Sequence, residues 1–196
     1  MVDVVSQLLS YPEAHQLFTL GKGIEFENHP NTLSDNAEEV LQRTQQRSRT
    51  DQICVYRSLE DRRSLAFIIE YKPPHKVSVE YLRAGLRPMD LWEEVVQRRT
   101  FPSDPGEKLN YNADRLPGAL ITQTFEYMIE NGLEYSYATN GEASVFLRVC
   151  ENDPTTVYYY LAEPNREADE QDSTGFRYPF TAVARSSAFV SWLFPR

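Results

Sequence analysis

The hydrophobic and polar positions of the chain predict short strands mixed with helices. Residues 65–69 are five consecutive apolar residues, which is typical of a strand buried on both faces of a sheet. Pro73 and Pro74 end that strand shortly after residue 72, because proline has no N–H to donate to a ladder. Upstream, residues 51–56 predict a partner strand, and the polar residues 58–63 predict the hairpin turn between them.

Helical spacing of apolar residues predicts helices on both sides of this hairpin. The helix that starts near residue 33 has acidic residues in its first turns and arginines at its end, which suits the helix dipole. The segment that ends the chain is helical or mixed in character and is expected to pack back on the sheet. The expected helices cover residues 2–9, 13–20, a stretch from 33, 77–86, 89–99, 119–131 and 180–193.

A second hairpin and several loops complete the expected element order. Asn140 and Gly141 predict a tight turn between strands at residues 135–138 and 143–150, and residues 155–161 predict a further strand. Loops are expected at residues 21–23, 100–117 and 163–172. The second of these is rich in Pro, Asp, Asn and Gly, so it is interpreted as a lid or binding loop, or as a disordered segment. The third holds five acids and one arginine and is expected to be solvated or disordered.

These elements predict one α/β or α+β layered domain over residues 1–196. Its core is expected at about residues 33–161, after an N-terminal helical extension over 1–32 and before an acidic loop and C-terminal helix over 162–196. The hydrophobic content of 41% is that of a folded protein, and no apolar run approaches the roughly 20 residues of a membrane helix. No membrane partner is therefore expected.

The cysteines and the N-terminus indicate an intracellular protein, either cytoplasmic or nuclear. Cys54 and Cys150 lie in apolar strand-like segments and form neither a disulfide framework nor a zinc pattern. They are interpreted as small core residues in a reducing compartment. A secretory signal is not expected, because the first residues lack a basic region followed by an apolar one.

The net charge of −9 is distributed unevenly along the chain. Residues 1–100 carry 13 Lys and Arg against 15 Asp and Glu, whereas residues 101–196 carry 7 against 14. This balance argues against a sequence-independent coat of nucleic acid, which needs a strongly basic face. It does not exclude an enzyme that meets phosphates through a metal ion.

Three charged residues lie at the ends of the first hairpin. Asp51 begins one strand, and Glu70 and Lys72 end the other on a shared face, with Tyr71 pointing the opposite way. Two neighbouring carboxylates are costly unless a cation lies between them, and oxygen donors suit magnesium or manganese. The lysine could orient or deprotonate a water, or stabilise charge on a phosphate. The alternatives are a surface salt bridge for Glu70 and Lys72 and a strand-start cap for Asp51.

The motifs in this part of the chain resemble those of the PD-(D/E)XK nuclease superfamily, which has the restriction-endonuclease-like fold. Asp51 matches the motif aspartate, although Thr50 stands where that motif has proline. Residues 70–72, Glu-Tyr-Lys, match the (D/E)-x-K element on the second strand of a hairpin. The resemblance covers roughly residues 33–149. It implies an α/β fold with a restriction-endonuclease-like core, in which helices flank a mixed β-sheet.

A third motif resembles the Q-x-x-x-Y element of the RecB and lambda-exonuclease-like branch. Gln123 and Tyr127 match its two named positions. Because they are four residues apart, they are expected on one helix face, opposite an apolar stripe. The stripe is formed by Ile121, Phe125 and Met128. The alternative is that both are ordinary polar-face residues, with Tyr127 half buried.

The resemblance implies an Mg²⁺- or Mn²⁺-dependent nuclease that hydrolyses phosphodiester bonds, with DNA as the expected substrate. By this resemblance Asp51, Glu70 and the backbone carbonyl of Tyr71 would hold the metal, and Lys72 would position the attacking water. Gln123 and Tyr127 would place the substrate or a neighbouring catalytic group. One further ligand would come from either Glu38 or Glu39, whose alternative is a helix-terminal charge. His75 and Lys76 would contact phosphate, or form an exposed loop pair.

Two stretches are also similar to the nuclease-like domain that precedes kinase-like domains in fungal proteins, including spore-killer toxins. These are residues 69–76 and 140–147. The likeness implies a kinase-like domain or a protein partner. It leaves open a second function, in which a nuclease-fold module no longer cuts and serves as an interaction or regulatory domain.

Overall fold

The predicted first hairpin is formed by β2 (Gln52–Arg57) and β3 (Arg63–Tyr71), which pair antiparallel. Gln52 lies opposite Ile69. In the turn between them, Asp61 has a φ of 62°, a left-handed conformation that aspartate tolerates better than most residues. The predicted hairpin and its turn are therefore confirmed.

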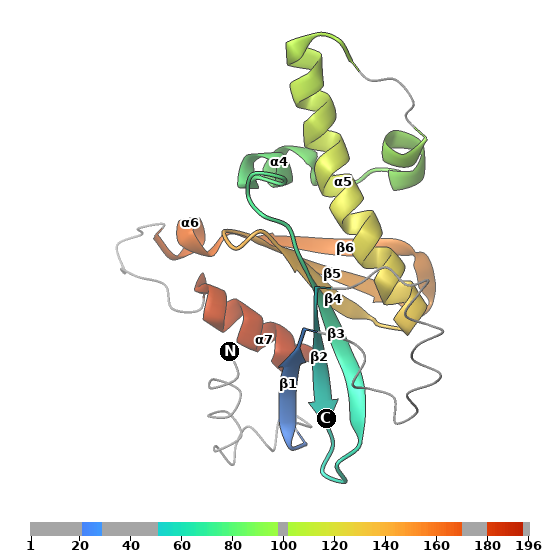
Figure 1. Ribbon diagram of the computed structural model, residues 1–196, viewed down its shortest axis with the longest axis vertical. Helices are drawn as coiled ribbons and strands as arrows, with labels where there is room; N and C mark the ends of the chain where they lie inside the picture. Colours follow the sequence, from blue (N-terminus) through green and yellow to red (C-terminus); the bar gives the residue numbers. More distant parts are fainter. Residues whose placement is uncertain (1–20, 29–50, 98–101, 170–179, 194–196) are drawn as a thin grey trace. The chain divides into compact units, whose positions relative to one another are not determined.

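The computed structural model describes residues 21–28, 51–97, 102–169 and 180–193 (Figure 1). These described residues divide into two compact units. The first contains the residues up to Ile69 together with those from Pro164 onward, and the second is Glu70–Glu163. The helices expected at residues 2–9, 13–20 and from 33 lie outside the described residues.

In the first unit, β1 (Gly23–Glu27) adds to the hairpin as a third antiparallel strand beside β2. The sequence patterns did not predict β1. Phe67 on β3 is fully buried, and its ring makes edge contacts with Phe26 of β1 and Phe189, at centroid distances of 6.1 and 5.2 Å. Phe189 lies on α7 (Ala182–Leu193), so the expected packing of the last helix against a strand is confirmed.

The acidic segment predicted as a loop at residues 163–172 is in part a helix, α6 (Pro164–Asp169). Proline suits the first position of a helix, because the N–H that it lacks would have no partner there. Arg185 of α7 forms an ion pair of 2.5 Å with Glu167 of α6 and offsets part of the negative charge. The loop prediction was therefore wrong for residues 164–169.

In the second unit, the end of β3 lies beside β4 (Tyr135–Thr139), and β5 (Ser144–Cys150) and β6 (Asp153–Ala162) follow in order. The pairs β4–β5 and β5–β6 are antiparallel. On β5, buried and less buried residues alternate as a half-covered strand requires. The turn before β5 contains Gly141 with a φ of 89°, which confirms the predicted Asn-Gly hairpin.

Two helices of the second unit pack closely at a glycine. They are α4 (Val79–Gly85) and α5 (Pro105–Asn131). A side chain at Gly85 would put its Cβ 1.8 Å from the carbonyl oxygen of Ala113, so only glycine fits there. Residue 117 within α5 is proline, which has no N–H for the Ala113 carbonyl one turn earlier. The backbone of Gly85 thus lies against the place where α5 lacks a hydrogen bond.

The prediction of a long loop at residues 100–117 was wrong, because α5 already begins at Pro105. Asp104 is its N-cap and accepts hydrogen bonds from the backbone N–H groups of Gly106 and Glu107, at 2.8 and 3.0 Å. Aspartate before proline is a strong helix start, since the cap satisfies exposed donors and proline has the φ of a helix. Asp104 and Pro105 in this segment therefore start a helix and do not indicate a loop.

Replacing Asp104 by alanine tests this start signal. The variant leaves two backbone donors without their carboxylate partner, so we expect a loss of about 1 kcal/mol in the free energy of unfolding. Urea denaturation followed by circular dichroism measures it. Ser103→Ala changes an exposed neighbour outside the helix and is the matched control. Equal stability of both variants would contradict the assignment.

The remaining expectations fare differently. Residues 77–86 contain the predicted helix α4, whereas the described part of the predicted helix at 89–99, residues 89–97, contains a short π-helix, η2 (Trp92–Val96). Cys54 is fully buried, and this burial raises the pKa of its thiol, as expected for an inert core cysteine. Cys150 is partly buried.

Among the helices described, none has the length and apolar character needed to span a membrane. The predicted fold class, a mixed α/β protein whose sheet is flanked by helices, is confirmed, and the restriction-endonuclease-like core remains a prediction.

Candidate functional site

A buried charge pair lies where β3 ends, at the start of the second unit. The amino group of Lys72 donates a hydrogen bond to Oε1 of Glu70. The Glu70 side chain is 2% exposed and the Lys72 side chain 26% exposed, so the carboxylate is buried whereas the amino group reaches solvent. Tyr71 between them is exposed. The predicted alternation, with the two charges on one side of the strand, is confirmed.

The segment after β3 is held by the second hairpin. The backbone N–H of Lys72 donates to the carbonyl oxygen of Thr139 at 2.9 Å. Five residues later, the carbonyl of Val77 accepts a hydrogen bond of 3.0 Å from Nδ2 of Asn140. Oδ1 of Asn140 accepts from the N–H groups of Glu142 and Ala143, which closes the turn between β4 and β5. This turn therefore fixes both ends of the segment that carries Lys72.

Asn140 and Thr139 are site-supporting residues that the sequence reading missed. Asn140 was interpreted only as a turn residue, although the stretches 69–76 and 140–147 were both singled out by their likeness to one family. In the structure the segment 72–77, which overlaps the first stretch, is hydrogen-bonded to Thr139 and Asn140 at the start of the second. Their shared likeness was a signal that they could be neighbours.

Asp51 lies immediately before β2 in the first unit and is exposed. The next residue, Gln52, is paired with Ile69 of β3. Because Glu70 belongs to the second unit, a metal ion shared between Asp51 and Glu70 stays a prediction. The further candidates Glu38 and Glu39 lie outside the described residues.

The donor atoms of this predicted metal site have suitable chemistry. The carboxylates of Asp51 and Glu70 and the carbonyl of Tyr71 are oxygen ligands, which Mg²⁺ and Mn²⁺ prefer over nitrogen or sulfur. In the part of the chain that the structure describes, no three His, Cys, Asp or Glu side chains gather into a group that could hold a metal. The type of ligand therefore fits Mg²⁺, whereas the complete ligand set remains a prediction.

Gln123 and Tyr127 are in contact on α5. Nε2 of Gln123 donates a hydrogen bond of 3.0 Å to the Tyr127 hydroxyl, as a spacing of four residues on a helix permits. Tyr127 is only 1% exposed and belongs to the core, as Ile121 and Met128 do. The alternative, in which Tyr127 is a half-buried residue of a polar face, was therefore wrong, because Tyr127 is almost fully buried. A role of the pair in placing substrate stays a prediction.

Tyr127→Phe measures what this hydrogen bond contributes. The substitution keeps the ring and removes the oxygen that accepts from Gln123, so we expect a loss of about 1 kcal/mol in the free energy of unfolding. Tyr158→Phe, at a 52% exposed tyrosine, is the control and should leave stability unchanged. Thermal and urea unfolding of both variants provide the comparison, and a Tyr127→Phe protein as stable as the control would contradict the expected contribution.

His75 and Lys76 lie in the exposed turn that follows the two prolines. The N–H groups of Lys76 and Val77 both donate to the carbonyl of Pro73, at 2.8 and 3.2 Å. These backbone bonds shape the turn and leave both side chains at the surface. Phosphate contact by His75 and Lys76 therefore stays a prediction, and an exposed loop pair remains its alternative.

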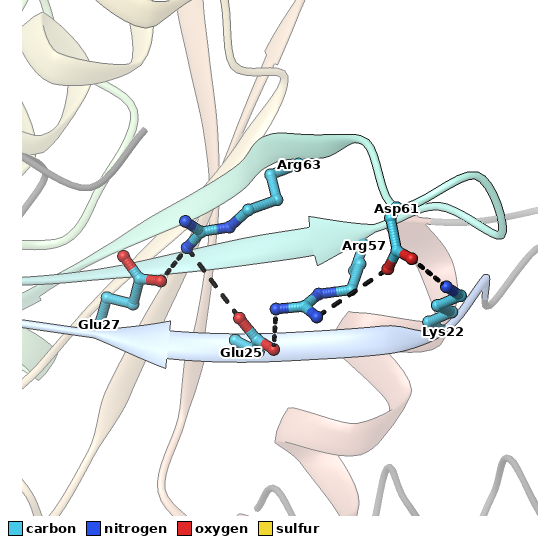
Figure 2. Close-up of polar contacts among 6 residues, drawn as sticks. All are labelled: Lys22, Glu25, Glu27, Arg57, Asp61 and Arg63. Carbon is cyan, nitrogen blue, oxygen red and sulfur yellow. Dashed lines mark hydrogen bonds and ion pairs between the residues drawn. The ribbon is translucent and has the colours of Figure 1, made fainter. Parts of the chain in front are cut away.

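The first unit has a surface network in which positive and negative side chains alternate (Figure 2). Arg57 forms an ion pair of 2.6 Å with Glu25, and Arg63 contacts Glu27. Because Arg57 and Arg63 are direct cross-strand neighbours, the carboxylates of β1 offset their mutual repulsion. The network consists of Lys22, Glu25, Glu27, Arg57, Asp61 and Arg63. Because the cations of this network are paired with carboxylates, the network does not offer nucleic acid a strongly basic surface.

The network makes one pH-dependent prediction. A hydrogen bond from Lys22 holds the pKa of Asp61 below its ordinary value of 3.8. A depressed pKa in the folded state contributes stability above pH 3.8, and this contribution is lost as the pH falls below that value. In Lys22→Met the pKa of Asp61 should rise toward 3.8, as followed by NMR titration of its carboxyl carbon. An unchanged pKa would contradict the role of Lys22, and Lys108→Met is the control.

The fold and the buried pair define a mixed α/β protein with a charged site at a strand end, and comparison with known proteins gives its family. Residues 27–194 match the family described as Spore killer 2 N-terminal domain, and the chain belongs to this family. It is 34% identical over 129 residues to the protein called Meiotic driver SPOK2 from Podospora anserina. That alignment covers 63% of this chain but only 16% of the relative, so the chain corresponds to a small part of the relative's length. No solved structure matches the chain.

Proposed function

We propose that this protein is a metal-dependent nuclease that hydrolyses phosphodiester bonds of nucleic acid, with DNA as the expected substrate. The observation that carries the proposal is the Glu70–Lys72 pair, in which a carboxylate with almost no exposure holds an amino group that still reaches solvent. A bound Mg²⁺ or Mn²⁺ would supply Lewis-acid stabilisation of the charge that develops on the phosphate. The resemblance to (D/E)-x-K nucleases supports the same assignment.

Stability alone is a poor explanation for a pair of this kind. Removing a carboxylate from water costs several kcal/mol, and attraction to a neighbouring cation often only offsets that cost. Two apolar side chains of similar volume at positions 70 and 72 would serve a structural purpose equally well. A chemical role for the charges is therefore the better explanation of their place at the end of an apolar strand.

Each residue has a distinct part in the proposed reaction. The Glu70 carboxylate orients the Lys72 amino group and, with Asp51 and the Tyr71 carbonyl, would hold the metal through oxygen donors. Lys72 donates a hydrogen bond that positions the attacking water or the phosphate oxygen. Asn140, through Val77, and Thr139, through the Lys72 backbone, keep the lysine in place.

The family suggests where such an activity would act. The relative is named a meiotic driver and the family is named after a spore killer, so we propose a toxin-like role inside fungal cells, in the cytoplasm or the nucleus. Because the chain matches only 16% of that relative, we also propose that the domain works beside further domains or a protein partner. Because the chain resembles domains that precede kinase-like domains, we propose that this further domain or partner is kinase-like.

A second function remains in competition: a nuclease-fold module that no longer cuts and acts in protein interaction or regulation. Two observations favour it. Residues 101–196 carry twice as many acids as bases, and no group of three metal-ligating side chains is found among the residues that the structure describes. This alternative predicts that added Mg²⁺ or Mn²⁺ changes neither activity nor stability.

The test of the proposal is a cleavage assay on the purified chain. Linear DNA, circular DNA and RNA are incubated with Mg²⁺, with Mn²⁺ and with EDTA, and the products are separated on gels. We expect metal-dependent cleavage of at least one substrate and none with EDTA. Absence of cleavage on all three substrates with either metal would favour the interaction module.

A further inference from the structure

The outer edge of β6 is unusually open for a sheet protein. β6 is the last strand in the order β4–β5–β6, and in the described part of the chain no strand pairs with its other side (Figure 1). From Pro154 to Ala162 it carries no charged side chain. Natural edge strands are usually protected by charges, prolines or bulges, because their outward N–H and C=O groups otherwise bind further strands. On β6 the proline and the register shift lie between Asp153 and Val157, and the strand is regular from Val157 to Ala162.

A cavity of about 780 Å³ lies along this strand within the second unit. Its walls come from β6, from α5 and from the segment that connects α4 to η2. Aromatic side chains supply much of the lining, and two of them are well exposed, Trp92 at 61% and Tyr158 at 52%. A mostly apolar cavity of this size is typical of a binding site for several side chains or a small ligand.

The charged residues around the cavity indicate which net charge a bound partner would carry. Arg87 at its rim is engaged by Glu94 at 2.8 Å and Asp114 at 3.4 Å. Asp90 lines the cavity, and Glu93 follows it on η2. Among the described residues at this rim, the acids Asp90, Glu94 and Asp114 outnumber the single base Arg87, which disfavours a phosphate-bearing ligand and favours a cationic partner.

The same charges disfavour a second copy of this chain. In an antiparallel pair of two β6 strands, the beginning of each strand would meet the end of the other. Glu151 and Asp153 stand at the beginning of β6, whereas Glu163, which follows its end, is already engaged by Arg83. Self-pairing would offer Glu151 and Asp153 of one copy only the Glu163–Arg83 pair of the other, whereas a partner strand with a basic end would be attracted to them.

We infer that the outer edge of β6 binds an extended segment of a partner protein as an additional strand. Main-chain hydrogen bonds join that segment to β6, and every second side chain, apolar or aromatic, enters the cavity beside Trp92 and Tyr159. Lysine or arginine residues at the ends of the segment face the acids of the rim and Glu151 and Asp153 at the beginning of β6. This surface is separate from the Glu70–Lys72 site and does not depend on the nuclease proposal.

A synthetic peptide tests the inference directly. The probe is a fluorescein-labelled peptide of about ten residues, the length of a long strand, with alternating Val, Tyr and Thr and with lysines at both ends. Binding to the full chain is measured by fluorescence polarisation. We expect saturable binding that weakens by at least about tenfold when glutamates replace the terminal lysines. Two further peptides carry N-methyl groups on either the odd or the even central residues, and only one of these should keep its affinity, because a strand pairs through one edge.

Protein variants complete the test. Thr156→Lys puts a charge on β6 and should weaken peptide binding by at least about tenfold, whereas Val183→Lys puts the same charge on α7 of the first unit and should not. Circular dichroism checks that both variants are folded. Absence of peptide binding, equal affinity for the lysine and glutamate peptides, equal affinity for both N-methylated peptides, or dimerisation that Thr156→Lys abolishes would each overturn the inference.

Discussion

Lys72→Met is expected to reduce metal-dependent cleavage by about 10²–10⁴-fold, the usual contribution of a positioned proton donor or acceptor. Methionine keeps an unbranched side chain of similar length and removes the amino group that Glu70 holds. The attacking water or the phosphate oxygen then loses its hydrogen-bond donor. Initial rates at saturating Mg²⁺ measure the effect, and circular dichroism verifies the fold.

Companion variants separate chemistry from general damage. Glu70→Gln and Asp51→Asn keep side-chain size, remove one negative charge each and should also abolish cleavage. Lys108→Met removes an exposed lysine of α5 and should leave the rate unchanged. Unchanged cleavage in Lys72→Met, Glu70→Gln and Asp51→Asn would refute the proposed site, and an equal loss in Lys108→Met would indicate a nonspecific effect of charge.

Phe67→Ala is expected to lower the free energy of unfolding by about 3–5 kcal/mol, the usual cost of deleting a buried aromatic ring. Phe67 has no exposed surface, and its ring contacts Phe26 of β1 and Phe189 of α7. The deletion therefore removes the contact that joins three elements of the first unit. Urea denaturation measures the loss.

Two controls frame this stability test. Phe67→Leu retains most of the apolar volume and should cost less than the alanine variant. Leu59→Ala, at a 75% exposed position in the hairpin turn, should cost almost nothing. A loss below about 1 kcal/mol for Phe67→Ala would show that the ring is not central to the core.

The strongest local signals in the sequence predicted the fold best. The apolar run of β3 and the Asn-Gly turn each determine their structure within a few residues, and both hairpins formed as expected. β1 escaped prediction because Glu25 and Glu27 alternate with apolar residues over only five positions. The first half of α5 was missed because the Pro, Asp, Asn and Gly content of residues 100–117 was interpreted as that of a loop, although Pro105 is a start signal and Pro117 is accommodated beside Gly85.

The candidate site shows the same division between local and distant information. Strand alternation was enough to place Glu70 and Lys72 on one side, and helix spacing was enough to bring Gln123 to Tyr127. Neither rule could reveal how deeply Glu70 and Tyr127 are buried, because burial depends on elements far away in the sequence. The contact of Asn140 with Val77 spans 63 residues and has no local signature.

The central claim, that Glu70 belongs to a metal site, is tested most directly by thermal unfolding with and without Mn²⁺. A ligand that binds only the folded state stabilises it, by about 2.7 kcal/mol at a hundred times its Kd. We predict that Mn²⁺ raises the melting temperature of the unmodified protein and that Glu70→Gln loses this response. A melting temperature that Mn²⁺ leaves unchanged, or raises equally in both proteins, would contradict the claim.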